Sequence, residues 1–153
     1  MLKGIDMHLE TQFSIFLVNK PGVLATVIGA LAKAKVNVVA LTLTDYEEHG
    51  VLRVVCDNAN LARTVLGKAH DRWTETDVLV LELPNEPGAF ASVAGTLADE
   101  HINISYAYST GGARGGHTTA VFKVVDLKKA MKVLGTSKLD KRAKNVKAPP
   151  TRG

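Results

Sequence analysis

The spacing of hydrophobic residues along the chain predicts a series of short strands and helices. Residues 11–18 first alternate between apolar and polar and then become apolar throughout, which is typical of a strand that ends buried on both faces. Helical spacing of apolar residues follows over about 23–35, and β-branched, apolar stretches at 36–44 and 51–56 flank the polar turn 45–50. A strand, a helix and a two-stranded hairpin therefore come first.

A second helix and a fourth strand complete this pattern. Asp57 or Asn58 can cap a helix whose apolar residues lie within 61–66, and a further strand is predicted at about 73–83. The order strand, helix, strand, strand, helix, strand is that of a ferredoxin-like unit, in which two helices cover one face of an antiparallel sheet. The predicted fold class is therefore α+β.

The chain then repeats the pattern. The stretch NKPGVLATV, which begins at Asn19, returns as NEPGAFASV from Asn85, and each copy has a later asparagine at the start of its next strand, Asn37 and Asn103. The elements predicted for the second copy are strand 78–82, a helix at about 90–97, strand 102–109, a Gly-rich hairpin, strand 119–125 and a helix from Asp126. A last strand would fall within 136–142, where few apolar residues support it.

We therefore expect two tandem domains, at residues 8–76 and 77–137, followed by a basic tail at 138–153. The formal net charge is +4, but the residues after Gly135 carry +5, which leaves −1 for the rest of the chain. A nearly neutral body is not expected to bind along the phosphate backbone of a nucleic acid. We expect the tail to be a disordered, solvating extension, in preference to an arm that binds nucleic acid or a membrane.

The composition is typical of a cytoplasmic protein without catalytic machinery. Cys56 is the only cysteine, which fits a reducing compartment, and neither a signal peptide nor a membrane span is evident. The histidines are scattered, and no Cys, Asp or Glu stands at metal-ligand spacing from them, so we expect no enzyme, no metal and no cofactor. The hairpin sequence TGGARGGH lacks the Lys-Ser/Thr of a phosphate-binding loop and is interpreted as a flexible turn.

The repeated Asn-x-Pro-Gly turn offers groups that suit a free α-amino acid. The start of a helix leaves backbone N–H groups without partners and attracts an anion such as a carboxylate. Gly22 and Gly88 would let a ligand approach the backbone, and the amides of Asn19 and Asn85 can both donate and accept. The alternative is that these residues only form turns, because a gene duplication also copies structural turns.

The element order, the two Asn-x-Pro-Gly turns and the later Val-Asn-Val and Ile-Asn-Ile resemble the ACT domain. This domain is the amino-acid-sensing module of enzymes such as phosphoglycerate dehydrogenase and the small subunit of acetolactate synthase. Both copies match over about residues 12–135, as in stand-alone tandem ACT proteins. The resemblance implies an amino acid bound between paired ACT domains, and a homodimer, because ACT sheets commonly pair edge to edge.

The resemblance also assigns ligand-binding residues to the turn before the first helix of each domain and to the later asparagines. They are Asn19, Pro21, Gly22, Val23, Leu24 and Asn37 in the first copy, and Asn85, Pro87, Gly88, Ala89, Phe90 and Asn103 in the second. Serine-sensing members have a histidine two residues before the motif asparagine, where this chain has Leu17 and Leu83. An apolar wall there would suit a less polar ligand side chain.

Tyr106 replaces a small residue of the first copy and could close the ligand pocket, although packing on its own sheet is the interpretation we favour.

We expect a non-catalytic regulator that binds a free amino acid at ACT domain interfaces and signals by conformational or oligomeric change. The alternative is a regulatory subunit, like that of acetolactate synthase, that acts only through a catalytic partner enzyme. A nucleic-acid binder would need aromatic and basic residues alternating on exposed strands, and this chain falls short of that pattern.

Overall fold

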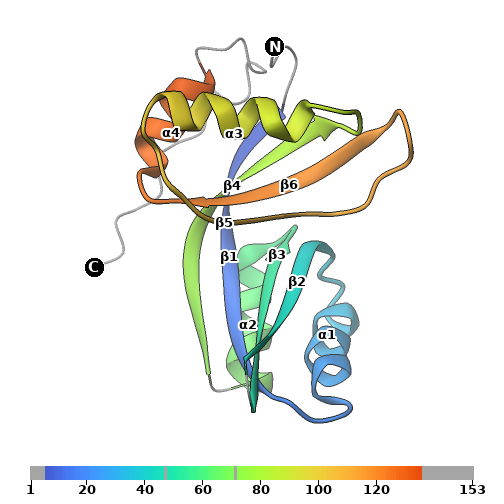
Figure 1. Cartoon of the computed structure of the whole chain (residues 1–153). Coiled ribbons are helices and arrows are strands. Elements are labelled where there is room, and N and C mark those ends of the chain that lie inside the picture. The colour runs from blue at the N-terminus through green and yellow to red at the C-terminus, as the bar shows by residue number, and fades with distance from the viewer. Residues whose placement is uncertain (1–5, 47, 71, 136–153) are drawn as a thin grey trace. The chain divides into compact units, whose positions relative to one another are not determined.

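The computed structural model describes residues 6–46, 48–70 and 72–135. The elements follow the predicted order and confirm the α+β class with ferredoxin-like architecture (Figure 1). Their bounds are β1 (Asp6–Val18), α1 (Val23–Lys33), β2 (Val38–Tyr46), β3 (His49–Cys56), α2 (Ala59–Ala69), β4 (Trp73–Pro84), α3 (Ala89–Asp99), β5 (Ile104–Ser109), β6 (His117–Val124) and α4 (Leu127–Gly135). None of the helices within the described ranges is long and apolar enough to cross a membrane.

The chain divides into two compact units. Of the described residues, those within 11–76 form the N-terminal unit, and those within 6–10 and 77–135 form the C-terminal unit. Residues 8–10, which the sequence pattern assigned to the first domain, therefore belong to the C-terminal unit. The tail 138–153 lies outside the described residues, as does the strand expected within 136–142.

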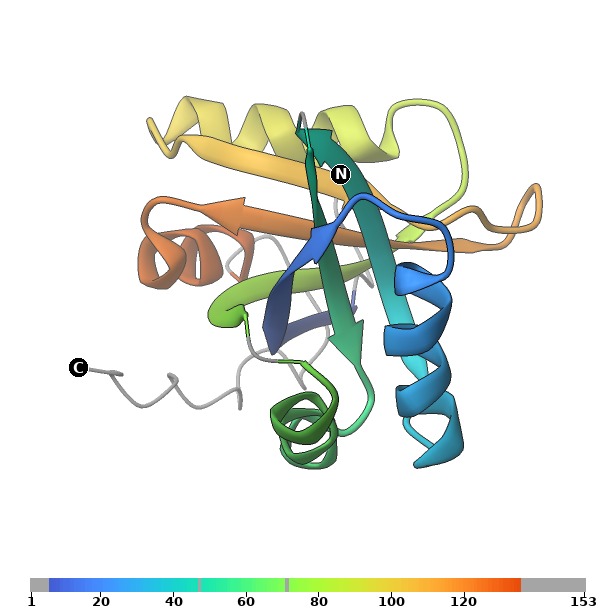
Figure 2. The same ribbon diagram turned by 90° about the horizontal axis from the view of Figure 1, so that it is seen from below.

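In the N-terminal unit the strand order is β2-β3-β1-β4, and β3 is antiparallel to both of its neighbours. Helix α1 lies beside β2, as both ribbon views show (Figures 1 and 2). The Asn58 side chain caps α2 by accepting a hydrogen bond from the Leu61 N–H at 3.0 Å. One face of the sheet and the two helices enclose a core of Phe13, Ile15, Leu17, Val27, Leu31, Val36, Leu52, Val54, Cys56, Ala62 and Leu66.

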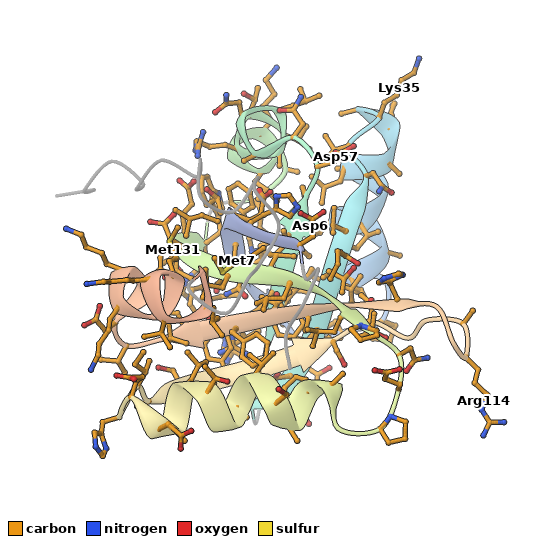
Figure 3. All side chains as sticks on the ribbon, turned by 90° about the horizontal axis from the view of Figure 1, so that it is seen from above. Asp6, Met7, Lys35, Asp57, Arg114 and Met131 are labelled. Carbon is orange, nitrogen blue, oxygen red and sulfur yellow. The ribbon has the colours of Figure 1, made fainter. Side chains whose placement is uncertain are left out.

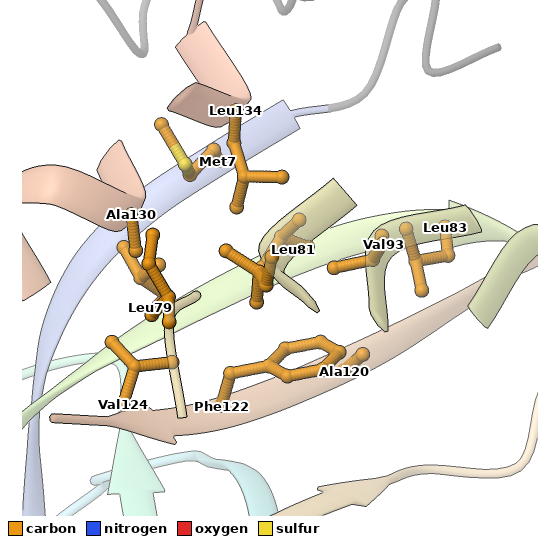
Figure 4. Packing of buried hydrophobic residues seen from close by; sticks show 12 residues of the cluster. Met7, Leu79, Leu81, Leu83, Val93, Ala120, Phe122, Val124, Ala130 and Leu134 are labelled. Atoms are coloured by element: carbon orange, nitrogen blue, oxygen red, sulfur yellow. The ribbon is translucent and has the colours of Figure 1, made fainter. Parts of the chain in front are cut away.

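In the C-terminal unit the strand order is β1-β4-β6-β5, with β6 antiparallel to β4 and β5. Residues 6–10 of β1 take the place beside β4 that the last strand of a ferredoxin-like unit would occupy. Met7 is 1% exposed and belongs to the same core as Leu79, Leu81 and Leu134 (Figure 4). The N-terminal segment joins this unit because Met7 buries its apolar side chain against this core.

Burial of Cys56 has a measurable consequence for stability at high pH. Burial, and then the nearby Asp57 charge, raise the pKa of the thiol from 9.0 to about 11. The unfolded chain therefore loses its thiol proton at a lower pH than the folded chain. The stabilisation is fully present below about pH 9 and is lost as the pH rises towards about 11.

We expect the urea midpoint to fall over this range more steeply in the natural protein than in Cys56→Ala, which lacks the titrating group. Comparison of the two variants removes the contributions of all other ionisable groups, which both proteins share. Equal pH slopes for the two proteins would show that burial of Cys56 does not perturb its ionisation.

Candidate functional site

The two Asn-x-Pro-Gly turns have the same backbone geometry. Gly22 has φ 88° and ψ −14°, and Gly88 has φ 88° and ψ −11°. A positive φ of this size favours glycine, so the motif glycine is required by the turn itself. Helices α1 and α3 begin at the next residue, and neither has a side-chain cap. The Val23 N–H donates back to the Lys20 carbonyl and the Ala89 N–H to the Glu86 carbonyl, both at 3.4 Å, so the N–H groups of the second and third residues of each helix are the ones that remain available to an anion.

The backbone N–H of each motif asparagine donates a hydrogen bond to the hairpin of the same unit. The Asn19 N–H donates to the Glu48 carbonyl at 3.0 Å, and the Asn85 N–H donates to the Gly116 carbonyl at 2.8 Å. Each turn is thereby fixed against the hairpin of its own unit. This shared bond shows that the hairpins, although different in sequence, occupy equivalent places in the two units.

The side chains of the two asparagines make different contacts. Asn85 Nδ2 donates to the backbone carbonyls of Gly112 and Ala113, at 3.0 and 3.1 Å. Asn19 Nδ2 instead donates to a carboxylate, Asp45 Oδ1, at 3.5 Å. The asparagine amide of the C-terminal unit is held by neutral groups and keeps its Oδ1 as an acceptor. The equivalent amide of the N-terminal unit is paired with an anion.

A cavity of about 430 Å³ lies at the turn of the C-terminal unit. The start of α3 and the end of β4 form one wall, and the β5–β6 hairpin forms the other. The lining residues are Leu83, Pro84, Asn85, Glu86, Ala89, Phe90, Ser109, Thr110, Gly111, Gly112 and Thr118. Asn85, Ala89 and Phe90 were predicted from the sequence, whereas Pro87 and Gly88 shape the turn without lining the cavity.

The lining of this cavity combines polar groups with an apolar surface. Glu86 supplies a carboxylate, the hairpin supplies three hydroxyl groups, and the uncapped N-terminus of α3 supplies N–H groups. Phe90 is 42% exposed, and its ring stacks on the buried Phe122 with 5.0 Å between centroids. An apolar surface therefore lies beside groups that can bind an ammonium and a carboxylate.

The later asparagines do not lie at the turns of their own units. The Asn37 N–H donates to Asp57 Oδ1 at 3.0 Å, and the Asn103 carbonyl accepts from the Val125 N–H at 3.1 Å. These contacts are at the far end of β3 and β6 from the turns. Strand β3 has eight residues, so its two ends lie seven residue steps, or roughly 23 Å, apart. Neither unit therefore brings Asn37 or Asn103 to its own Asn-x-Pro-Gly turn.

Tyr106 lies on the other face of its sheet from the cavity. It pairs with Lys123, whereas the next residue, Ala107, pairs with Phe122 of the core. Residues paired across antiparallel strands point to the same face, so the tyrosine faces away from the helices. Tyr106 does not line the cavity, which fits the interpretation that it packs on its own sheet.

The cavity also contains residues that the sequence analysis did not single out. Glu86 is the variable residue of the motif, where the first copy has Lys20. Ser109, Thr110 and Thr118 come from the hairpin, and only a comparison of the two copies residue by residue could have marked them. In the N-terminal unit, Val23 and Leu24 are half-buried against the core.

The described ranges contain no group of three or more His, Cys, Asp or Glu side chains arranged to hold a metal ion. The fold and the paired turns define a tandem α+β module of two ferredoxin-like units. A sequence model for a family described as an ACT domain pair matches residues 7–147. The chain belongs to this ACT domain pair family.

Solved structures agree with this assignment. Protein BT0572 from Bacteroides thetaiotaomicron is 34% identical, with 88% of this chain and 92% of that chain covered and a TM-score of 0.80. The ligand-free regulatory subunit of aspartate kinase from Thermus thermophilus has the same fold at 14% identity, with 88% and 96% covered and a TM-score of 0.64. A comparison with curated proteins finds no match to this sequence.

Proposed function

We propose that this protein is a non-catalytic cytoplasmic regulator that binds a free amino acid in the cavity at the Asn85 turn of its C-terminal ACT domain. The observation that carries the proposal is the cavity of about 430 Å³ beside the Asn85 turn, which is lined by the Glu86 carboxylate, the start of α3 and the apolar ring of Phe90. Membership of the ACT domain pair family supports a regulatory role. No catalytic group is part of the proposal.

The lining suggests how the ligand lies. Its α-carboxylate faces the uncapped N-terminus of α3, and its ammonium lies near Glu86 and the Asn85 carbonyl oxygen. Its side chain lies against Leu83 and Phe90. An apolar ligand side chain gains binding free energy by burying its surface against these residues. Serine has too little apolar surface to gain in the same way.

Binding is coupled to the assembly of the protein in this proposal. A ligand shifts an equilibrium by its differential affinity for the two states. Strand β2 is an edge strand of the N-terminal unit and carries Leu41 and Leu43, which are 45% and 47% exposed. Pairing of this edge with a second copy would cover both leucines. Light scattering that gives the mass of one chain, with and without ligand, would exclude the homodimer.

A regulatory subunit of a catalytic enzyme is the second candidate function. It is favoured by the fold shared with the regulatory subunit of aspartate kinase over 96% of that chain. Such a subunit would bind its amino acid tightly only with the partner present. Co-purification of an enzyme of amino-acid biosynthesis with the full chain, released by one amino acid, would support it over the stand-alone regulator.

The proposed function is tested by thermal unfolding against the standard free L-amino acids. A ligand at about a hundred times its dissociation constant adds roughly 2.7 kcal/mol and raises the midpoint by several degrees. We expect such a shift with one amino acid or a small group of apolar ones. The double substitution Asn19→Ala/Asn85→Ala should remove the shift while the chain still unfolds cooperatively. If no amino acid shifts the midpoint, the stand-alone regulator is wrong and the partner-dependent subunit is favoured.

A further inference from the structure

The strand registers show which residues are equivalent around the two turns. Leu17 pairs with Gly50 in the N-terminal unit, and Leu83 pairs with Thr118 in the C-terminal unit. Leu17 and Leu83 both stand two residues before the motif asparagine. Gly50 therefore occupies the place of Thr118, which lines the cavity. The N-terminal unit has no side chain at this position.

A leucine side chain extends over this glycine in the N-terminal unit. Leu43 Cδ1 lies 3.4 Å from where a Cβ on Gly50 would be. Leu43 pairs with Leu52, and Ser109 pairs with Ala120, so Leu43 is the equivalent of Ser109. Leu43 thus stands in the place of Ser109, and its side chain extends over the place of the Thr118 hydroxyl. The N-terminal unit offers an apolar surface in place of two hydrogen-bonding groups.

The charged groups around the two turns also differ. Asp45 follows Leu43 by two residues, as Gly111 follows Ser109, so a carboxylate stands where the cavity is lined by glycine. This carboxylate accepts the hydrogen bond from the Asn19 amide. At the variable position of the motif, the N-terminal unit has Lys20 where the C-terminal unit has Glu86. An amino acid bound in the same orientation would have its ammonium beside Lys20, a like charge, and would find the Asp45 side chain in the wall of the site.

We propose that the two turns are not equivalent and that only the Asn85 turn binds the amino acid. This inference rests on the proposed function and adds which copy of the motif carries it. The turn at Asn19 keeps the backbone geometry, because the fold of the unit requires it, but Asp45 and Leu43 occupy the ligand space. Each chain therefore binds one amino acid, at the cavity of the C-terminal unit.

The test transfers the blocking carboxylate into the cavity. Gly111 has no positive φ, and a Cβ built there meets nothing within 4 Å, so a side chain fits without strain. Gly111→Asp places a carboxylate where Asp45 stands in the other unit, and Gly111→Asn is its neutral counterpart of equal size. By calorimetry on the full chain, with the amino acid found in the thermal screen, Gly111→Asp should bind at least about tenfold more weakly than Gly111→Asn.

Asp45→Asn should leave both the affinity and the stoichiometry of one per chain unchanged. In an isotope-labelled chain, the ligand should shift backbone amides at 85–90 and 109–118 and not those at 19–24. Two ligands per chain, equal affinities for the two Gly111 variants, or amide shifts at the Asn19 turn would overturn the inference and leave the proposed function standing. Absence of binding by every standard L-amino acid would overturn both.

Discussion

Replacing Met7 by alanine should lower the free energy of unfolding by about 2 to 5 kcal/mol, the usual range for removing a buried methionine side chain. Met7 is 1% exposed and packs in the core of the C-terminal unit, with Met131 at the edge of the same cluster (Figures 3 and 4). The residue lies in a segment that a division of the sequence into consecutive domains would place outside this core.

The measurement is urea unfolding followed by circular dichroism. His8→Ala is the matched control, because the neighbouring side chain is about a third exposed and lies outside the core cluster. We expect the control to change stability by less than about 0.5 kcal/mol, the usual range for surface substitutions. If Met7→Ala were as stable as the control, residues 6–10 would not form a strand of this unit in solution.

Replacing Gly112 by alanine is expected to destabilise the protein by about 1 to 3 kcal/mol, because the added methyl group overpacks the hairpin. A Cβ at this position would overlap the carbonyl oxygen of His117 and crowd the Thr118 side chain. The backbone must then move, and the Gly112 carbonyl that accepts from Asn85 moves with it. The substitution should therefore also weaken amino-acid binding at the cavity.

Gly111→Ala is the control for stability, since a Cβ on the neighbouring glycine meets nothing within 4 Å. Thermal unfolding of the two variants compares Gly112, where an added Cβ clashes, with Gly111 of the same hairpin, where it does not. Equal midpoints for the two variants would mean that the hairpin relaxes without cost and that its conformation is not fixed by Gly112.

Local features of the fold could be predicted from the sequence. The helical spacing after Pro21 and the glycine at each turn predicted the starts of α1 and α3 to within about two residues, because both depend on neighbouring residues only. The repeat of Asn-x-Pro-Gly predicted two turns of equal conformation. The position of Tyr106 depends instead on an irregularity, the register shift between Ile104 and Tyr106, which changes the face that later residues of β5 occupy.

By itself, the sequence determined the order of elements, the paired turns and the ACT family, since these follow from periodicity and from residues with particular backbone preferences. Only the tertiary structure decided that Met7 completes the C-terminal sheet and that residues 109–118 form a wall of the cavity at Asn85. Both are contacts between segments far apart in the chain. Which of these long-range contacts form depends on which surfaces can be buried together. The conformational preferences of neighbouring residues do not determine that.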